Sequence, residues 1–356
     1  MIHRTVARAL TVCGAAIMGV LAVGATPASA HPASVQVAVD YQTRITAVPA
    51  GLAVRFVADG SRLELRSESG RVVEVLGYQG EPWIQLRADG VWINTRSPSH
   101  YLDLPDSPQK AAADPNAAPQ WQRSSAGSYA RWHDHRVVWH GNAPPAVRAD
   151  PSRAHRIRDW TVPLRVGDDT VQLAGTLDWL PPPSAGAWWA VVLIAAAGIA
   201  ALGLRVRAAL RGVAVLTGLT SVVTAVVLVA TNVEPTAGGW ASGLASETIP
   251  ILVGLAMCAA AIAGRTAADF GFAFTGIGVA IFSGVVNAPV FSHAVGPVPA
   301  DGFWTRLAVT VLVAGGVGLA IAGAGGMVRG AGQPAPAPEE APAPLSGHGV
   351  SQQDVV

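Results

Sequence analysis

Residues 171–204 read VQLAGTLDWLPPPSAGAWWAVVLIAAAGIAALGL, and this stretch divides the chain into two unlike parts. Its first residues, up to Trp179, alternate between two faces, as in a β-strand with one buried side. The prolines at 181–183 end that strand because proline has no backbone N–H to donate to a sheet. The run at 186–204 that follows is apolar, carries no charge, and is close to the ~20 residues that cross a bilayer. We therefore expect a β domain before residue 185 and a membrane domain after it.

The composition supports a membrane protein. Of the 356 residues, 51% are hydrophobic and only 13% are charged, which is a low share for a soluble chain. The formal net charge is +1, so bulk charge does not predict nucleic-acid binding. The two cysteines, Cys13 and Cys258, fall in the first apolar stretch and in a later one, and the β domain is expected to have neither a disulfide nor a thiolate metal site.

The N-terminus has the pattern of a cleavable signal peptide over residues 1–30. Arg4 and Arg8 precede an apolar stretch at 9–25, and Ala28-Ser29-Ala30 is a small-x-small cleavage site. Cleavage there would leave His31 as the first residue of an extracytoplasmic domain. Export and membrane insertion are therefore the expected fate of the chain.

Residues 31–184 predict an extracytoplasmic all-β domain, a sandwich or a small barrel. Short alternating runs such as 52–56 are separated by turn residues, and Gly167-Asp168-Asp169 has the pattern of a hairpin turn. A further strand is expected at 129–139. The segment 107–127 is rich in Pro, Ala, Ser and Gln, and is either a long loop or a boundary between two β subdomains.

Residues 185–328 predict an all-α bundle of five transmembrane helices. The expected spans are 186–204, 212–231, 248–264, 270–291 and 307–327. Arginines concentrate in alternate loops and after the last span (Arg205, Arg207, Arg211, Arg265 and Arg329). The positive-inside rule then places the β domain outside and the C-terminus in the cytoplasm of a multi-pass cell-membrane protein.

Two further features of the C-terminal half follow from the polarity of its residues. The Pro- and Ala-rich residues 329–356 cannot bury a core and predict a disordered cytoplasmic tail. Within the spans, glycines favour close helix packing, and the few polar residues that could serve a conduction path, Glu247 and Asn287, lie near the outer ends.

The densest group of histidines lies at 131–140, which reads RWHDHRVVWH. On a strand, His133 and His135 would share one face and His140 would point the other way. Such a pair suits copper or zinc but needs a third donor, and a free N-terminal His31 could supply both its amine and its ring nitrogen. We therefore expect extracytoplasmic metal handling, with copper first. Further possible donors are His140, His155 and Asp134. The alternative interpretation has these histidines packed structurally beside Trp132 and Trp139.

A second hypothesis uses local charge. Five arginines, interleaved with His and Trp, could form a basic patch that contacts anionic lipid or an envelope polymer: Arg131, Arg136, Arg153, Arg156 and Arg158. The neighbouring histidines could then make the patch a pH-responsive sensor. The nucleophile, zinc-protease, Walker and dinucleotide motifs are missing from the sequence, so we expect a non-enzyme.

A histidine-first outer domain followed by several spans resembles bacterial copper-resistance proteins of the CopC/CopD (YcnJ-like) kind. This resemblance implies copper capture outside the membrane with His31 as a ligand. The chain departs from that family in having few spans and no Met-rich stretches. The Trp-His-Asp-His-Arg segment at 132–136 is similar instead to a group of uncharacterised membrane proteins from high-GC Gram-positive bacteria, and that similarity implies no particular activity.

Overall fold

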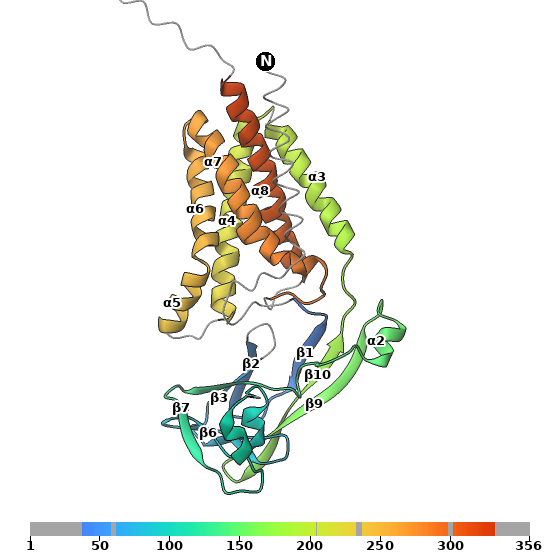
Figure 1. Cartoon of the computed structure of the whole chain (residues 1–356), viewed down its shortest axis with the longest axis vertical. Coiled ribbons are helices and arrows are strands. Elements are labelled where there is room, and N and C mark those ends of the chain that lie inside the picture. The colour runs from blue at the N-terminus through green and yellow to red at the C-terminus, as the bar shows by residue number, and fades with distance from the viewer. Residues whose placement is uncertain are drawn as a thin grey trace, which may run out of the picture.

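The computed structural model describes residues 38–57, 62–104, 106–203, 205–232, 237–297 and 302–331. The predicted signal peptide, His31, and the predicted tail beyond residue 331 lie outside the described residues. Figure 1 shows a β domain at one end of a bundle of helices, joined to it through the start of α3 (Ala185–Gly203).

The β domain consists of two antiparallel sheets. The larger sheet has the strand order β1 (Tyr41–Ala47), β10 (Asp169–Trp179), β9 (His155–Val166), β4 (Val73–Leu76), β5 (Pro82–Arg87), β6 (Gly90–Asn94) and β7 (Trp121–Ser125). The smaller sheet has the order β2 (Leu52–Val57), β3 (Arg62–Ser67) and β8 (Tyr129–His133). The two sheets share one core, in which Leu63 and Leu65 of β3 are buried in the same cluster as Leu164 and Leu173 of the larger sheet. Of the two architectures that the sequence left open, the described strands form the sandwich.

Several local predictions can now be compared with the structure. The β9–β10 hairpin turns at Gly167, whose φ of +62° favours glycine. The segment 107–127 contains β7, which pairs with β6 in the larger sheet. This segment begins with the short 3-10 helix η2 (Pro108–Ala112), which follows η1 (Pro98–Tyr101). A single turn of helix, α2 (Pro145–Ala149), precedes β9.

The strand expected at 129–139 was predicted too long, since β8 ends at His133. The reason is local hydrogen bonding. The Asp134 carboxylate accepts the backbone N–H of Arg136, and the Tyr78 hydroxyl accepts the backbone N–H of His135. These amides are therefore withdrawn from any ladder, and the chain turns after His133.

The helical part contains four helices long and apolar enough to cross a membrane, or five if one bent pair forms a single span. The elements are α3, α4 (Arg207–Asn232), α5 (Ala237–Ser246), α6 (Thr248–Ile262), α7 (Arg265–Gly278), η3 (Val279–Gly284), η4 (Val285–Phe291) and α8 (Gly302–Ala331). The bent pair is α5 and α6, whose axes differ by 60°. η3 is a π-helix and η4 a 3-10 helix, so the expected span at 270–291 is irregular toward its end.

The bundle packs through glycines and a few polar pairs. Gly276 of α7 and Gly316 of α8 face each other so closely that a Cβ on either would lie within 2.6 Å of the other's carbonyl oxygen. In the interior, the hydroxyls of Ser221 and Ser283 are 2.6 Å apart, and the Asn287 amide donates to the Ser283 carbonyl. Glu247 lies at the bend between α5 and α6. These contacts satisfy polar groups that lipid cannot.

The β domain is tied to the bundle at a second point besides the chain connection at 180–185. Val39 forms an antiparallel bridge with Val295, which follows η4. The Asp40 carboxylate lies 3.0 Å from Nδ1 of His293, and Arg306 of α8 donates to the carbonyl of His293. The segments that flank β1 and η4 therefore hold each other in place.

Candidate metal centre

Three potential metal ligands meet at the surface of the β domain: Asp103, His133 and His135. Their ligand atoms all lie within 4.8 Å of one another. Nε2 of His135 and Nδ1 of His133 are 2.8 Å and 3.4 Å from carboxylate oxygens of Asp103. The side chains of Asp103, His133 and His135 are 50%, 27% and 32% exposed, so an ion can enter from solvent.

His140 joins this group, contrary to the prediction that its side chain points away. Its ring stacks on His135 with centroids 4.2 Å apart and lies 5.8 Å from the ring of His133. The prediction assumed a straight strand through residue 139. Because the chain turns after β8, residues beyond the turn come back to the face that carries His133.

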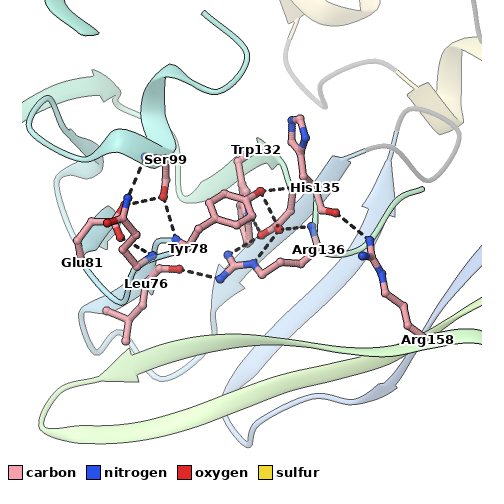
Figure 2. A network of polar contacts seen from close by, with 10 residues as sticks. Leu76, Tyr78, Glu81, Ser99, Trp132, His135, Arg136 and Arg158 are labelled. Atoms are coloured by element: carbon pink, nitrogen blue, oxygen red, sulfur yellow. Dashed lines mark hydrogen bonds and ion pairs between the residues drawn. The ribbon is translucent and has the colours of Figure 1, made fainter. Parts of the chain in front are cut away.

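A buried network holds the backbone of His135 in place (Figure 2). Asp134, which is fully buried, accepts hydrogen bonds from the Arg136 guanidinium, the Trp132 indole and the Tyr78 hydroxyl. The Tyr78 hydroxyl in turn accepts the His135 backbone N–H at 2.7 Å, and Arg158 donates to the His135 carbonyl at 2.9 Å. With both backbone groups fixed, the His135 ring projects away from the network (Figure 2).

The same network reaches the segment that carries Asp103. The backbone N–H of Tyr78 donates to the Ser99 hydroxyl, which donates to the buried carboxylate of Glu81 at 2.5 Å. Ser97 donates to the same carboxylate, so Glu81 anchors the first turn of η1, which leads to Asp103. The loop after η1 and the turn after β8 are thus positioned by one set of hydrogen bonds.

The charge state of the cluster suits a cation. Burial raises the pKa of Asp103, but hydrogen bonds and charge from His135 and His133 outweigh it, and the net shift is downward. Burial, and then the neighbouring histidines, lower the pKa of His140. The carboxylate is therefore ionised, and the His140 ring is favoured in the neutral form that ligates metals. Burial and the nearby Asp134 charge raise the pKa of Tyr78, so its hydroxyl stays protonated.

Imidazole nitrogen with one carboxylate oxygen is a ligand set that Zn²⁺ and Cu²⁺ accept. Of the predicted ligands, His133 and His135 come together, while His31 lies outside the described residues. His155 lies elsewhere, with Nε2 2.6 Å from the carbonyl of Asp150. The Asp134 carboxylate is fully occupied by its network. The structure thus places His140 with the pair and separates His155 and Asp134 from it.

The sequence did not predict Asp103 as a ligand, and its position explains why. It lies 30 residues before His133, in a loop after a 3-10 helix, and no spacing rule relates the two. Tyr78 links the two segments, because its hydroxyl donates to Asp134 and its backbone N–H donates to Ser99 of η1.

Three of the five arginines of the predicted basic patch pair with carboxylates. Arg131 pairs with buried Glu64 and Arg136 with Asp134. Arg156 pairs with Asp159 and Asp178. Arg158 donates to the carbonyls of His135 and Val138, and Arg153 is exposed on the loop before β9. These contacts support a structural role for Arg131, Arg136 and Arg156, because paired charges attract anionic surfaces weakly.

Three carboxylates in the β domain predict acid sensitivity. Burial raises the pKa of Asp134, Glu64 and Glu81, but their hydrogen bonds outweigh it, so each folded-state pKa is lowered. Such groups stabilise the fold above their unfolded pKa and lose that contribution as pH falls through the folded value. We expect a denaturant midpoint that is nearly constant above about pH 5 and falls progressively below about pH 4.

Tryptophan fluorescence of the detergent-purified chain in guanidinium, measured from pH 7 to pH 3, checks this expectation. Asp134→Asn should show a shallower dependence on pH, because it removes one of the three carboxylates. A midpoint that rises on acidification would contradict it.

Comparison of the chain with protein-family models, with curated proteins and with solved structures gave no significant match.

Proposed function

We propose that the chain is a membrane-anchored, extracytoplasmic metal-handling protein that binds a divalent transition-metal ion, copper first. The observation that carries this proposal is the convergence of Asp103, His133 and His135 at an accessible surface. Three donors of suitable type beside a buried network that fixes the backbone of His135 support a preorganised site. The ion acts as bound cargo, and the proposed role is not enzymatic.

The proposed topology places the β domain outside the cell and the C-terminus in the cytoplasm. The signal-peptide pattern and the arginine-rich loops support it. Aromatic side chains gather near the β-domain end of the helices, where Trp188 stacks on Phe291 and approaches Phe303. Such a belt is typical of a membrane–water interface. Protease accessibility of the β domain in intact cells tests this orientation.

Metal titration of the full chain in detergent tests the binding site. We expect one Cu²⁺ or Zn²⁺ per chain at this site, and loss of that ion in the triple variant Asp103→Ala/His133→Ala/His135→Ala. His155→Ala is the matched control, because it removes a histidine of the same domain that lies outside the cluster. Equilibrium dialysis followed by elemental mass spectrometry gives the stoichiometry.

A second measurement tests whether the N-terminal amine of His31 contributes to metal binding. A chain with an additional residue before His31 would lose the chelating amine but keep the cluster. Binding that survives this change and fails in the triple variant supports the cluster. The reverse result, or equal binding by the triple variant and His155→Ala, contradicts the proposal.

A further inference from the structure

A third histidine, His140, lies beside the three proposed ligands. His140 contacts both His133 and His135, and its side chain is exposed. Within the described part of the chain, its ring makes no hydrogen bond or ion pair. A histidine with a structural role usually has a hydrogen-bond partner for a ring nitrogen, and the nearest groups to the His140 ring are instead two other imidazoles.

We propose that His140 is the fourth ligand of the metal site, and that the occupied site is a closed centre of three imidazoles and one carboxylate. This inference rests on the proposed function and deepens it. It identifies the cargo as a borderline divalent ion of the Cu²⁺ or Zn²⁺ class, because Mg²⁺ and Ca²⁺ prefer all-oxygen sites. A tetrahedral ion such as Zn²⁺ with four protein ligands has no open position for a substrate water, so the proposed role is capture of the metal rather than hydrolysis.

Two of the three ring spacings are close to those of such a site. A metal–nitrogen bond of about 2.0–2.1 Å puts each ring centroid about 3.2 Å from the ion, so two rings at a tetrahedral angle have centroids about 5.2 Å apart. The His133 ring is 5.2 Å from His135 and 5.8 Å from His140. Only the stacked pair, His135 and His140, is too close, at 4.2 Å. The donor atoms that already lie within 4.8 Å of one another are those of Asp103, His133 and His135, so the His140 ring must move to bring a nitrogen to the ion. Opening the stack by about 1 Å would give its centroid the spacing that a tetrahedral ion requires.

The backbone around His140 permits this small movement. The preceding residues are anchored, because Arg158 donates to the Val138 carbonyl and the Trp139 ring stacks with Tyr41. Gly141 follows with a φ of +94°, and no heavy atom lies within 4 Å of where a Cβ would stand. The His140 side chain can therefore rotate beside a fixed turn without moving the other ligands.

Electron paramagnetic resonance of the Cu²⁺-loaded full chain tests this inference. We expect coupling to three imidazole nitrogens in the unaltered protein and to two in His140→Ala. We also expect His140→Ala to bind at least ~10-fold more weakly, because even the loss of an outer hydrogen-bond partner of a ligand costs about 10–100-fold. Competition with a chelator of known affinity measures this ratio, and His155→Ala serves as the control. Thermal unfolding should be unchanged in His140→Ala, since the side chain is exposed.

The outcomes separate the two proposals. If neither Cu²⁺ nor Zn²⁺ binds the unaltered protein, the proposed function fails, and this inference fails with it. If the ion binds and is lost in the triple variant, but His140→Ala shows the same affinity and the same nitrogen coupling, only the fourth ligand is wrong. Equal binding of Mg²⁺ or Ca²⁺ would overturn the assignment of the cargo.

Discussion

Asp134→Ala is expected to unfold much of the β domain under conditions in which the unaltered chain is stable. The change removes a fully buried carboxylate and leaves the Arg136 guanidinium, the Trp132 indole and the Tyr78 hydroxyl without their acceptor. Breaking a buried ion pair from one side costs about 3–5 kcal/mol. That is a large share of the roughly 5–15 kcal/mol that stabilises a typical domain.

Hydrogen exchange of the full chain in detergent, followed by mass spectrometry, measures this loss in the β domain separately from the bundle. We expect peptides of β8 and β3 to exchange faster and the apparent Tm of the domain to fall by about 10 °C. Asp159→Ala is the matched control, because it breaks another Asp–Arg pair, with Arg156, on an exposed surface. Similar protection in the two variants would show that Asp134 is not a central element of the fold. Residual metal binding should weaken as well, since the His135 backbone loses its support.

Gly316→Leu is expected to prevent normal assembly of the helical bundle. A Cβ at this position would lie 2.6 Å from the carbonyl oxygen of Gly276 and 2.8 Å from the amide nitrogen of Ala280. Both atoms belong to the backbone, so no side-chain rotation relieves the clash and the two helices must separate. Overpacking by single methylenes already costs about 1–3 kcal/mol, and we expect at least the upper end of that range.

Gly325→Leu in the same helix is the control, because nothing lies within 4 Å of a Cβ there. Size-exclusion chromatography and thermal unfolding in detergent distinguish the two variants. We expect Gly316→Leu to aggregate or to melt well below the unaltered chain, and Gly325→Leu to behave normally. Equal behaviour of the two variants would contradict the close approach of α7 and α8.

The sequence predicted the division of the chain and most strands, because alternation and apolar length are local properties. It could not place β7, whose residues 121–125 are mostly exposed and polar. It also predicted one uninterrupted span at 270–291, whereas the π-helix and 3-10 helix there depend on packing and on Pro289. Irregular helix geometry of this kind leaves only a faint pattern in the sequence.

The candidate site shows the same limit. His133 and His135 were found from their spacing, but the reason they converge is not the strand alternation that suggested them. The turn after β8 is made by the side chain of Asp134, which had been considered as a metal ligand. Asp103 and His140 enter the site through contacts between distant segments, and such contacts cannot be read from one segment alone.

The bridge between Val39 and Val295, with the Asp40–His293 pair beside it, has a mechanical consequence. A body attached by a single tether can pivot freely, whereas one fastened at two separate points keeps at most one axis of rotation. Tilting of the β domain therefore cannot be absorbed by the prolines at 181–183 alone. We expect a force on the β domain to reach the irregular helix η4 through Val295. The β domain and that part of the bundle should therefore move together.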